Sequence, residues 1–193
     1  IIPEGVRGFQ FSFNLTERKT KLGGNNMKQV PYNQYLVEVE QHLKQGGVFL
    51  SAKAEKINTM VIGWGGINVY WGKPIFVVPV RKSRYTHDLI EKSGEFTVSI
   101  PLKEDMRKAL AFCGTKSGRD FDKFKECNLT PEPGQKVNAP IIKECSLHYE
   151  CKVVYKQDMI PDNLDAEIDK KFYPSPDYHT LYFGEIVACY LTE

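Results

Sequence analysis

The sequence predicts a mainly β fold whose antiparallel strands close, or nearly close, into a barrel. Three observations support this class: the apolar runs are short, polar and apolar residues alternate along several of them, and strands do not alternate regularly with long helices. With 193 residues, of which 41% are hydrophobic, the chain is long enough for one domain with a sizeable core and too short for two full domains.

Charge and cysteine usage exclude several classes of function. The 26 basic and 24 acidic residues are spread along the chain, so the net charge is only +2 and we expect no nucleic-acid partner. No apolar run approaches the ~18 residues of a membrane span, and the first residues lack the pattern of a secretory signal. The five cysteines form no C-x-x-C pair and no zinc-site spacing. We therefore expect a soluble, cytoplasmic protein with no membrane partner and no metal site.

The N-terminal part differs from the rest, and we predict an extension over residues 1–26 and a barrel domain over residues 27–193. Glycines and a polar run interrupt the extension. Phe9, Phe11 and Phe13 alternate as in a short strand, which predicts pairing with the body of the protein or with another subunit. Met27 is a candidate for the natural start.

The first elements of the domain are predicted to be a helix and a hairpin. The helical pattern begins at Pro31, carries apolar residues at helical spacing and ends at the glycine pair Gly46-Gly47. Residues 48–53 and 57–64 are apolar, strand-like runs joined by a three-residue polar link. That arrangement predicts two adjacent antiparallel strands.

The middle of the chain is predicted to alternate strands with short helices. Residues 75–80 form a third strand, rich in β-branched residues. A helix follows with Thr86 as its predicted N-cap and Gly94 as its stop. Residues 95–100 alternate as a fourth strand, and residues 106–113 have the spacing of another helix.

Two strands and an acidic loop complete the predicted barrel. Residues 145–156 alternate as a long, half-buried antiparallel strand. Residues 182–191 are apolar on both faces, which predicts burial within the fold or at a subunit interface. Between these strands, residues 158–177 are expected to form a surface loop with one helical turn near Glu167, which either covers a site or merely connects the strands.

The most informative motif is the turn R-K-S-R-Y-T at residues 81–86. Arg81, Lys82 and Arg84 lie beside the predicted helix N-terminus, where free N–H groups and a partial positive charge favour an anion. The turn therefore predicts a phosphate site. The alternative is a solvated basic turn with an ordinary helix cap.

Four segments, taken together, resemble the flavin reductase-like family that has the FMN-binding split barrel and includes the flavoredoxins. They are residues 57–64, the turn 81–86, residues 113–124 and the strand entered by His179, and they occur in the family's order within residues 30–191. The resemblance implies a six-stranded antiparallel Greek-key split barrel with short flanking helices. It also implies a homodimer with FMN near the dimer interface.

The resemblance further implies a set of site residues. Those that would hold the FMN phosphate are Ser83, Arg84 and Thr86. Those that would line or pack against the isoalloxazine ring are Asn58, Thr59, Met60 and Trp64. Those on the loop near the cofactor are Ser117, Arg119 and Lys123. His179 corresponds only by its place before the last strand, and it is the one candidate for a catalytic residue.

Physical chemistry supports some of these assignments and leaves alternatives for others. A polar Asn58-Thr59 pair inside an apolar strand needs partners if it is buried, and a cofactor edge would supply them; the alternative is a turn pair at the hairpin's mouth. Trp64 could equally be a core residue. On sequence alone Lys123 is expected to be solvated, and Cys113 to serve packing.

The histidines give little independent support for acid–base catalysis. His42 and His148 fall on predicted polar faces, and His87 on an exposed helix start. His179 follows the acidic loop and is placed to reach a site, although a histidine at a strand entry needs no such role.

The leading hypothesis is an FMN-dependent oxidoreductase that takes hydride from NAD(P)H and passes electrons to a flavin, a metal ion or a protein acceptor. The cofactor carries the chemistry, so a catalytic triad or carboxylate pair is not required. No dinucleotide fingerprint follows any predicted strand. The main alternative is therefore an FMN-binding electron carrier that a protein partner reduces. A third is a split barrel that has lost flavin and binds another ligand.

Overall fold

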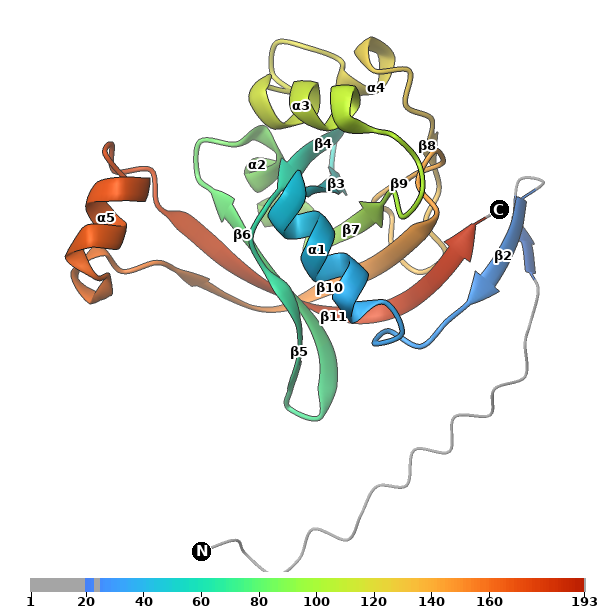
Figure 1. Cartoon of the computed structure of the whole chain (residues 1–193), viewed down its shortest axis with the longest axis horizontal. Helices are drawn as coiled ribbons and strands as arrows, with labels where there is room; N and C mark the ends of the chain where they lie inside the picture. Colours follow the sequence, from blue (N-terminus) through green and yellow to red (C-terminus); the bar gives the residue numbers. More distant parts are fainter. Residues whose placement is uncertain (1–19, 23–24, 193) are drawn as a thin grey trace, which may run out of the picture.

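Six antiparallel strands form a split barrel in a computed structural model that describes residues 20–22 and 25–192 (Figure 1). The strands are β3 (Val48–Lys53), β4 (Ile57–Ile62), β6 (Lys73–Arg81), β7 (Glu95–Ile100), β10 (Leu147–Asp158) and β11 (His179–Thr192). Their hydrogen-bonded order is β4-β3-β7-β10-β11-β6. The pairs β3–β7 and β6–β11 join strands that are not consecutive, as Greek-key connections do. The predicted mainly β barrel is confirmed.

The barrel is open along one line, between β4 and β6. Among the six barrel strands these two are the ends of the hydrogen-bonded order and form no ladder with each other, although the short strand β5 (Gly66–Tyr70) pairs with the first half of β6. We call this line the seam. Because backbone pairing does not close it, side chains from both strands can face a common space there.

Strands β10 and β11 are the longest and carry much of the core. β11 pairs with β10, β6 and β2 (Asn25–Gln29), and every residue along it is buried or half-buried, in agreement with the burial predicted for the last strand. β10 is fully buried on both faces from Leu147 to Cys151 and exposed beyond it, whereas alternation predicted a half-buried strand throughout. Pairing with β7 and β11 on its two sides explains the difference. His148, predicted on a polar face, is consequently buried.

Short helices surround the barrel. They are α1 (Leu36–Gln45), α2 (Tyr85–Ser93), α3 (Arg107–Thr115), α4 (Lys123–Glu126) and α5 (Ala166–Phe172), with a 3₁₀ turn at Pro161–Asn163. The N-cap of α2 is Arg84, so the prediction of Thr86 as N-cap is wrong. The Thr86 side chain is instead fully buried in the first turn, where its hydroxyl accepts a hydrogen bond from the Asn58 amide. Within the described residues no helix has the length and apolarity needed to cross a membrane.

Several short strands were not predicted. β5 (Gly66–Tyr70) pairs with β6 in a hairpin that projects from the barrel (Figure 1), where no strand was predicted. β1 (Thr20–Leu22) pairs with β2, which runs through residue 27, the expected domain boundary. β8 (Pro131–Glu132) and β9 (Ile141–Ile142) form a separate small sheet. The strand expected at Phe9 to Phe13 lies outside the described residues.

Candidate functional site

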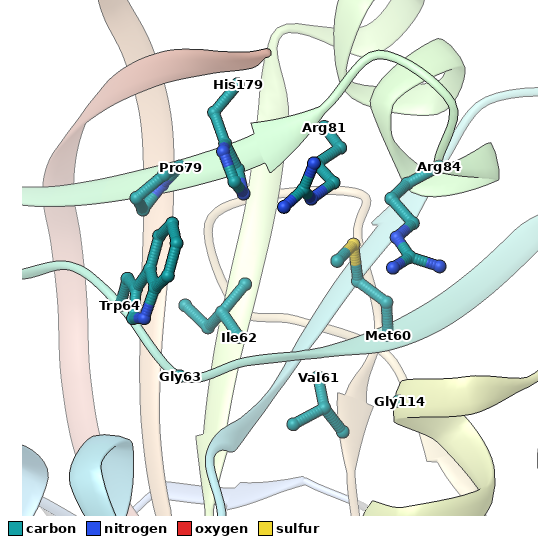
Figure 2. Close-up of a pocket in the computed structure, with 10 residues that line it drawn as sticks. All are labelled: Met60, Val61, Ile62, Gly63, Trp64, Pro79, Arg81, Arg84, Gly114 and His179. Carbon is teal, nitrogen blue, oxygen red and sulfur yellow. The ribbon is translucent and has the colours of Figure 1, made fainter. Parts of the chain in front are cut away.

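The seam contains a cavity of about 170 Å³. Its walls include the side chains of Met60 from β4, Trp64 just after β4, Pro79 and Arg81 from β6, Arg84 from the following turn, and His179 from the start of β11. Figure 2 shows these side chains converging from both sides of the seam. Three of the six, Met60, Trp64 and Arg84, are among the residues that the sequence assigned to cofactor binding, and His179 is the catalytic candidate.

Trp64 forms an aromatic wall of the cavity. β4 ends at Ile62, so Trp64 lies outside the ladder and its ring, 42% exposed, packs across the seam. Its centroid lies 5.2 Å from that of Phe172 in an edge arrangement and 5.1 Å from that of His179. These contacts leave part of the indole accessible, which suits stacking against a planar ligand.

His179 is a neutral group in this site. Its ring is buried and its Nδ1 lies 2.7 Å from the hydroxyl of Tyr173. Burial, and then the nearby charge of Arg81, lower the pKa of His179 to about 4. At physiological pH the imidazole ring is therefore uncharged, and it can offer a ligand a hydrogen bond but no positive charge.

The turn at residues 81–84 carries three cations, which differ in whether they already have a protein partner. Arg81 donates to the backbone oxygens of Phe172 (2.7 Å) and Asp177 (2.8 Å), and Lys82 pairs with Asp158 at 2.6 Å. The Arg84 side chain has no hydrogen-bond or ion-pair partner among the described residues, and its guanidinium lies at the cavity (Figure 2). Arg84 is therefore the cation of this turn that an incoming anion could engage without breaking an existing pair.

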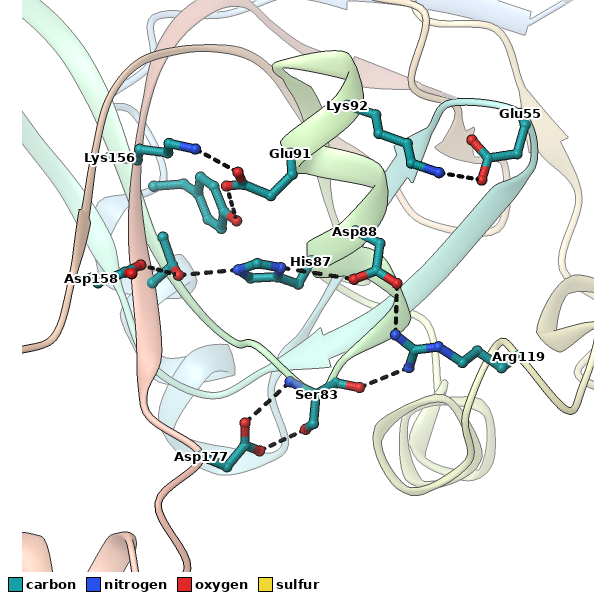
Figure 3. Close-up of polar contacts among 12 residues, drawn as sticks. Glu55, Ser83, His87, Asp88, Glu91, Lys92, Arg119, Lys156, Asp158 and Asp177 are labelled. Atoms are coloured by element: carbon teal, nitrogen blue, oxygen red, sulfur yellow. Dashed lines mark hydrogen bonds and ion pairs between the residues drawn. The ribbon is translucent and has the colours of Figure 1, made fainter.

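Ser83, beside Arg84, already holds an anion. Its backbone N–H donates to Asp177 Oδ1 at 3.1 Å and its hydroxyl donates to Asp177 Oδ2 at 2.6 Å (Figure 3). On the other side, Arg119 donates to the Ser83 carbonyl at 2.8 Å and to the Asp88 carboxylate at 2.7 Å. The hydroxyl of Ser117 accepts from the Arg119 N–H at 3.2 Å. The loop that carries Ser117 and Arg119 is thus bonded to the turn at residues 81–84 and to α2.

A second group of assigned residues forms a buried polar layer where β4 meets the first turn of α2 and the loop before α4, and Asn58 and Lys123 of this layer also line a second cavity, of about 540 Å³. Asn58 donates to Thr86 Oγ1 at 2.8 Å, and Thr59 accepts from Ser51 at 3.1 Å and donates to the Leu50 carbonyl at 3.3 Å. A Cβ added at Gly118 would lie 2.0 Å from the Asn58 side-chain oxygen, so the loop backbone packs directly on that amide. Asn58 and Thr59 are strand residues with protein partners, and the turn-pair alternative is wrong.

Lys123 belongs to this layer as well. The sequence favoured a solvated lysine, but the side chain is buried and its ammonium donates to the carbonyls of Thr59 (3.0 Å) and Cys113 (2.7 Å). Desolvation lowers the pKa of Lys123. Cys113 is buried in a hydrophobic cluster, and burial followed by the neighbouring Cys127 raises its thiol pKa to about 12, which agrees with a packing role.

Sequence reasoning missed the residues that reach the seam from the acidic segment, namely Phe172, Tyr173 and Asp177. The segment 158–177 contains the 3₁₀ turn at Pro161–Asn163 and α5, where one helical turn was expected, and its C-terminal end folds back over the turn at residues 81–84. No local signal identifies these residues, because their contacts join positions about 90 residues apart in the chain. Among the described residues no cluster of His, Cys, Asp or Glu has the arrangement of a metal site.

Known proteins resemble this chain in both sequence and fold. Residues 42–193 match the family described as "Flavin reductase like domain". An uncharacterized protein of Archaeoglobus fulgidus is 34% identical over 157 residues, which cover 80% of this chain and 73% of that protein. Flavoredoxin from Methanosarcina acetivorans is 32% identical, with a TM-score of 0.60 and coverage of 75% of this chain and 67% of the other. A protein with a split barrel domain from Shewanella frigidimarina shares the fold at 18% identity, with a TM-score of 0.59 and coverage of 78% and 71%.

Proposed function

The chain belongs to the flavin reductase-like family, and from that premise we propose that it is an FMN-dependent oxidoreductase whose cofactor lies in the seam. It would take hydride from NADH or NADPH and pass electrons to a flavin, a metal ion or a protein acceptor. FMN, when bound, supplies the hydride-accepting and electron-transferring chemistry. The protein's part is to bind and orient it.

The observation that carries this proposal is the pairing of two environments along one seam. An aromatic and apolar space lies beside Trp64 and Met60, and a free guanidinium with a serine turn lies at its end, beside the N-terminus of α2. This matches a planar ring system joined to a phosphate. That Ser83 already holds a carboxylate supports the fit, because its two donors are arranged for an anion.

The residues divide the binding task between them. Arg84 and Ser83 would hold the phosphate, while Trp64 and Met60 would contact the ring system. Neutral His179 would offer a hydrogen-bonding edge without adding charge. The cavity of about 170 Å³ is smaller than the ~300–1,000 Å³ usual for ligand sites, so the ring system would be only partly enclosed unless Phe172 moves aside.

An anaerobic titration tests the proposal. The purified protein is loaded with FMN, its visible absorption spectrum is recorded, and NADH or NADPH is added without oxygen. Bleaching of the flavin band by either nucleotide is expected. Bound FMN that neither nucleotide bleaches would refute the reductase, and a protein that takes up no FMN would refute the flavin site itself.

The second candidate function is an FMN-binding electron carrier that a protein partner reduces. The 32% identity to a flavoredoxin favours it, as does the lack of a dinucleotide fingerprint in the sequence. Bound FMN that is inert to both nucleotides, but is reduced by dithionite and reoxidised by a redox protein, would establish the carrier.

An exposed aromatic patch on the β5–β6 hairpin and the neighbouring strands supports a homodimer. Tyr70, Trp71, Tyr155 and Phe183 contact one another there, with Trp71 64% exposed. Such a patch favours a protein partner, and we propose a second copy of this chain. Sedimentation velocity should find a dimer that Trp71→Asp converts to monomer, whereas Val37→Asp, on the exposed face of α1, leaves the dimer intact. A monomeric parent protein would refute the proposal.

A further inference from the structure

The anion position at Ser83 is filled by a carboxylate of the chain itself. Both carboxylate oxygens of Asp177 are engaged, one by the Ser83 N–H at 3.1 Å and the other by the Ser83 hydroxyl at 2.6 Å (Figure 3). The side chain is only 27% exposed. Asp177 thus occupies the same donors that the proposed phosphate site requires.

Further contacts keep this carboxylate in place. The Arg81 guanidinium donates to the backbone oxygens of Asp177 and Phe172, and it lies 4.9 Å from the centre of the Tyr173 ring. Phe172 packs on Trp64, and Tyr173 bonds His179. One short segment, residues 172–177, therefore contacts both ends of the seam at once.

A phosphate and this carboxylate cannot share the Ser83 donors. A phosphate monoester carries a charge of about −1.5 to −2 at pH 7, so it would be repelled by Asp177 as well as deprived of both hydrogen bonds. It must displace the carboxylate before it binds. Riboflavin has no phosphate, and its ring system can enter beside Trp64 without this exchange.

We propose that Asp177 is a specificity-determining residue: it competes with the FMN phosphate for Ser83 and thereby reduces the site's preference for FMN over riboflavin. This rests on the proposed function. Apparent affinity scales with the fraction of molecules in the binding-competent state, so a carboxylate that fills the turn about 90% of the time would weaken phosphate binding about tenfold. Binding of the unphosphorylated ligand would stay the same.

Equilibrium titrations of Asp177→Ala and Asp177→Asn with FMN and with riboflavin test the inference. Asp177→Ala should bind FMN about tenfold more tightly than the parent protein and riboflavin within about twofold of it. Asp177→Asn, which keeps the shape and removes the charge, should lie between. Glu167→Ala removes one negative charge from the neighbouring helix α5, has no contact with Ser83 and should change neither affinity.

Calorimetric titration with inorganic phosphate separates this inference from the proposed function. If Asp177 competes for the turn, Asp177→Ala binds inorganic phosphate more tightly than the parent even should no flavin bind. Unchanged or weaker binding of both FMN and phosphate by the two variants would overturn the inference. An equal gain for FMN and riboflavin would also overturn it, because that result would mean a steric effect on the rings.

Discussion

The seam and the buried polar layer are built from neighbouring residues of the same strand and turn, yet they differ in how their polar groups are satisfied. At the seam, the Arg84 guanidinium has no partner among the described residues and Ser83 holds a carboxylate that is partly exposed. In the layer, Asn58, Thr59 and Lys123 are buried and bonded to other protein groups. Partners at the seam can be exchanged for a ligand, whereas those in the layer cannot be lost without a cost in stability.

This difference assigns the two regions different parts in the same site. The layer fixes the backbone of β4 and the first turn of α2 through buried hydrogen bonds that need no ligand. The seam then supplies groups that a ligand can engage. Mutations in the layer should therefore act mainly on the free energy of unfolding, and mutations at the seam mainly on ligand affinity.

The largest effect is expected from Lys123→Met. The change removes a buried donor from the carbonyls of Thr59 and Cys113 and should lower the free energy of unfolding by about 2–3 kcal/mol. Urea denaturation measures the loss. Lys125→Met, an exposed change two residues further along α4, is the matched control and should cost little. Equal stability of the two variants would contradict a structural role for Lys123.

His148 should make stability depend on acid pH. Its ring bonds Ser99 and Thr192, and burial lowers the pKa of His148 from 6.5 to about 3. Below pH 6.5 the unfolded chain takes up a proton that the folded protein refuses, so stability falls as pH falls from 6.5 toward 3. The slope approaches about 1.4 kcal/mol per pH unit well below pH 6.5, and the loss between pH 6.5 and 5 is about 1.6 kcal/mol.

The variant His148→Gln isolates the contribution of His148 to the pH dependence of stability. His87 and His179 also have lowered pKa values and act in the same direction, so the parent protein alone cannot assign the slope. Urea denaturation of the parent and of His148→Gln at several pH values gives the difference. The variant should be flatter than the parent over this range, and parallel curves would exclude His148 as the source.

Sequence reasoning recovered the barrel because its signals are local. Alternation marked β7 and β10, and apolar runs marked β4, β6 and β11. Sequence reasoning also located the turn that contains Ser83 and Arg84, because the residues that mark this turn are adjacent in the chain. Side-chain partners such as Thr86 for Asn58, the carbonyls for Lys123, and Asp177 for Ser83 depend on contacts distant in sequence, which no periodicity encodes.

Arg84→Ala tests the seam side of the comparison. Loss of a charge-assisted hydrogen bond to phosphate should weaken FMN binding by about 1.5 kcal/mol or more, roughly tenfold, while riboflavin binding changes little. Stability should stay the same, because the Arg84 side chain has no hydrogen-bond or ion-pair partner among the described residues, and its backbone bonds to Arg81 and His87 do not depend on the side chain. Fluorescence titration with both flavins measures the ratio. Equal losses for FMN and riboflavin would show that the turn does not hold the phosphate.

The smallest effect on FMN affinity is expected from Thr86→Val, although Thr86 lies two residues from Arg84. Its hydroxyl already accepts the Asn58 amide, so valine leaves that buried N–H without a partner and should lower the free energy of unfolding by about 1–2 kcal/mol. FMN affinity should fall several times less than in Arg84→Ala. Thr86→Ser, which keeps the hydroxyl, serves as the control. Thr86→Val could instead lose as much FMN affinity as Arg84→Ala while riboflavin affinity stays unchanged. That result would show that Thr86 belongs to the phosphate site and not to the polar layer.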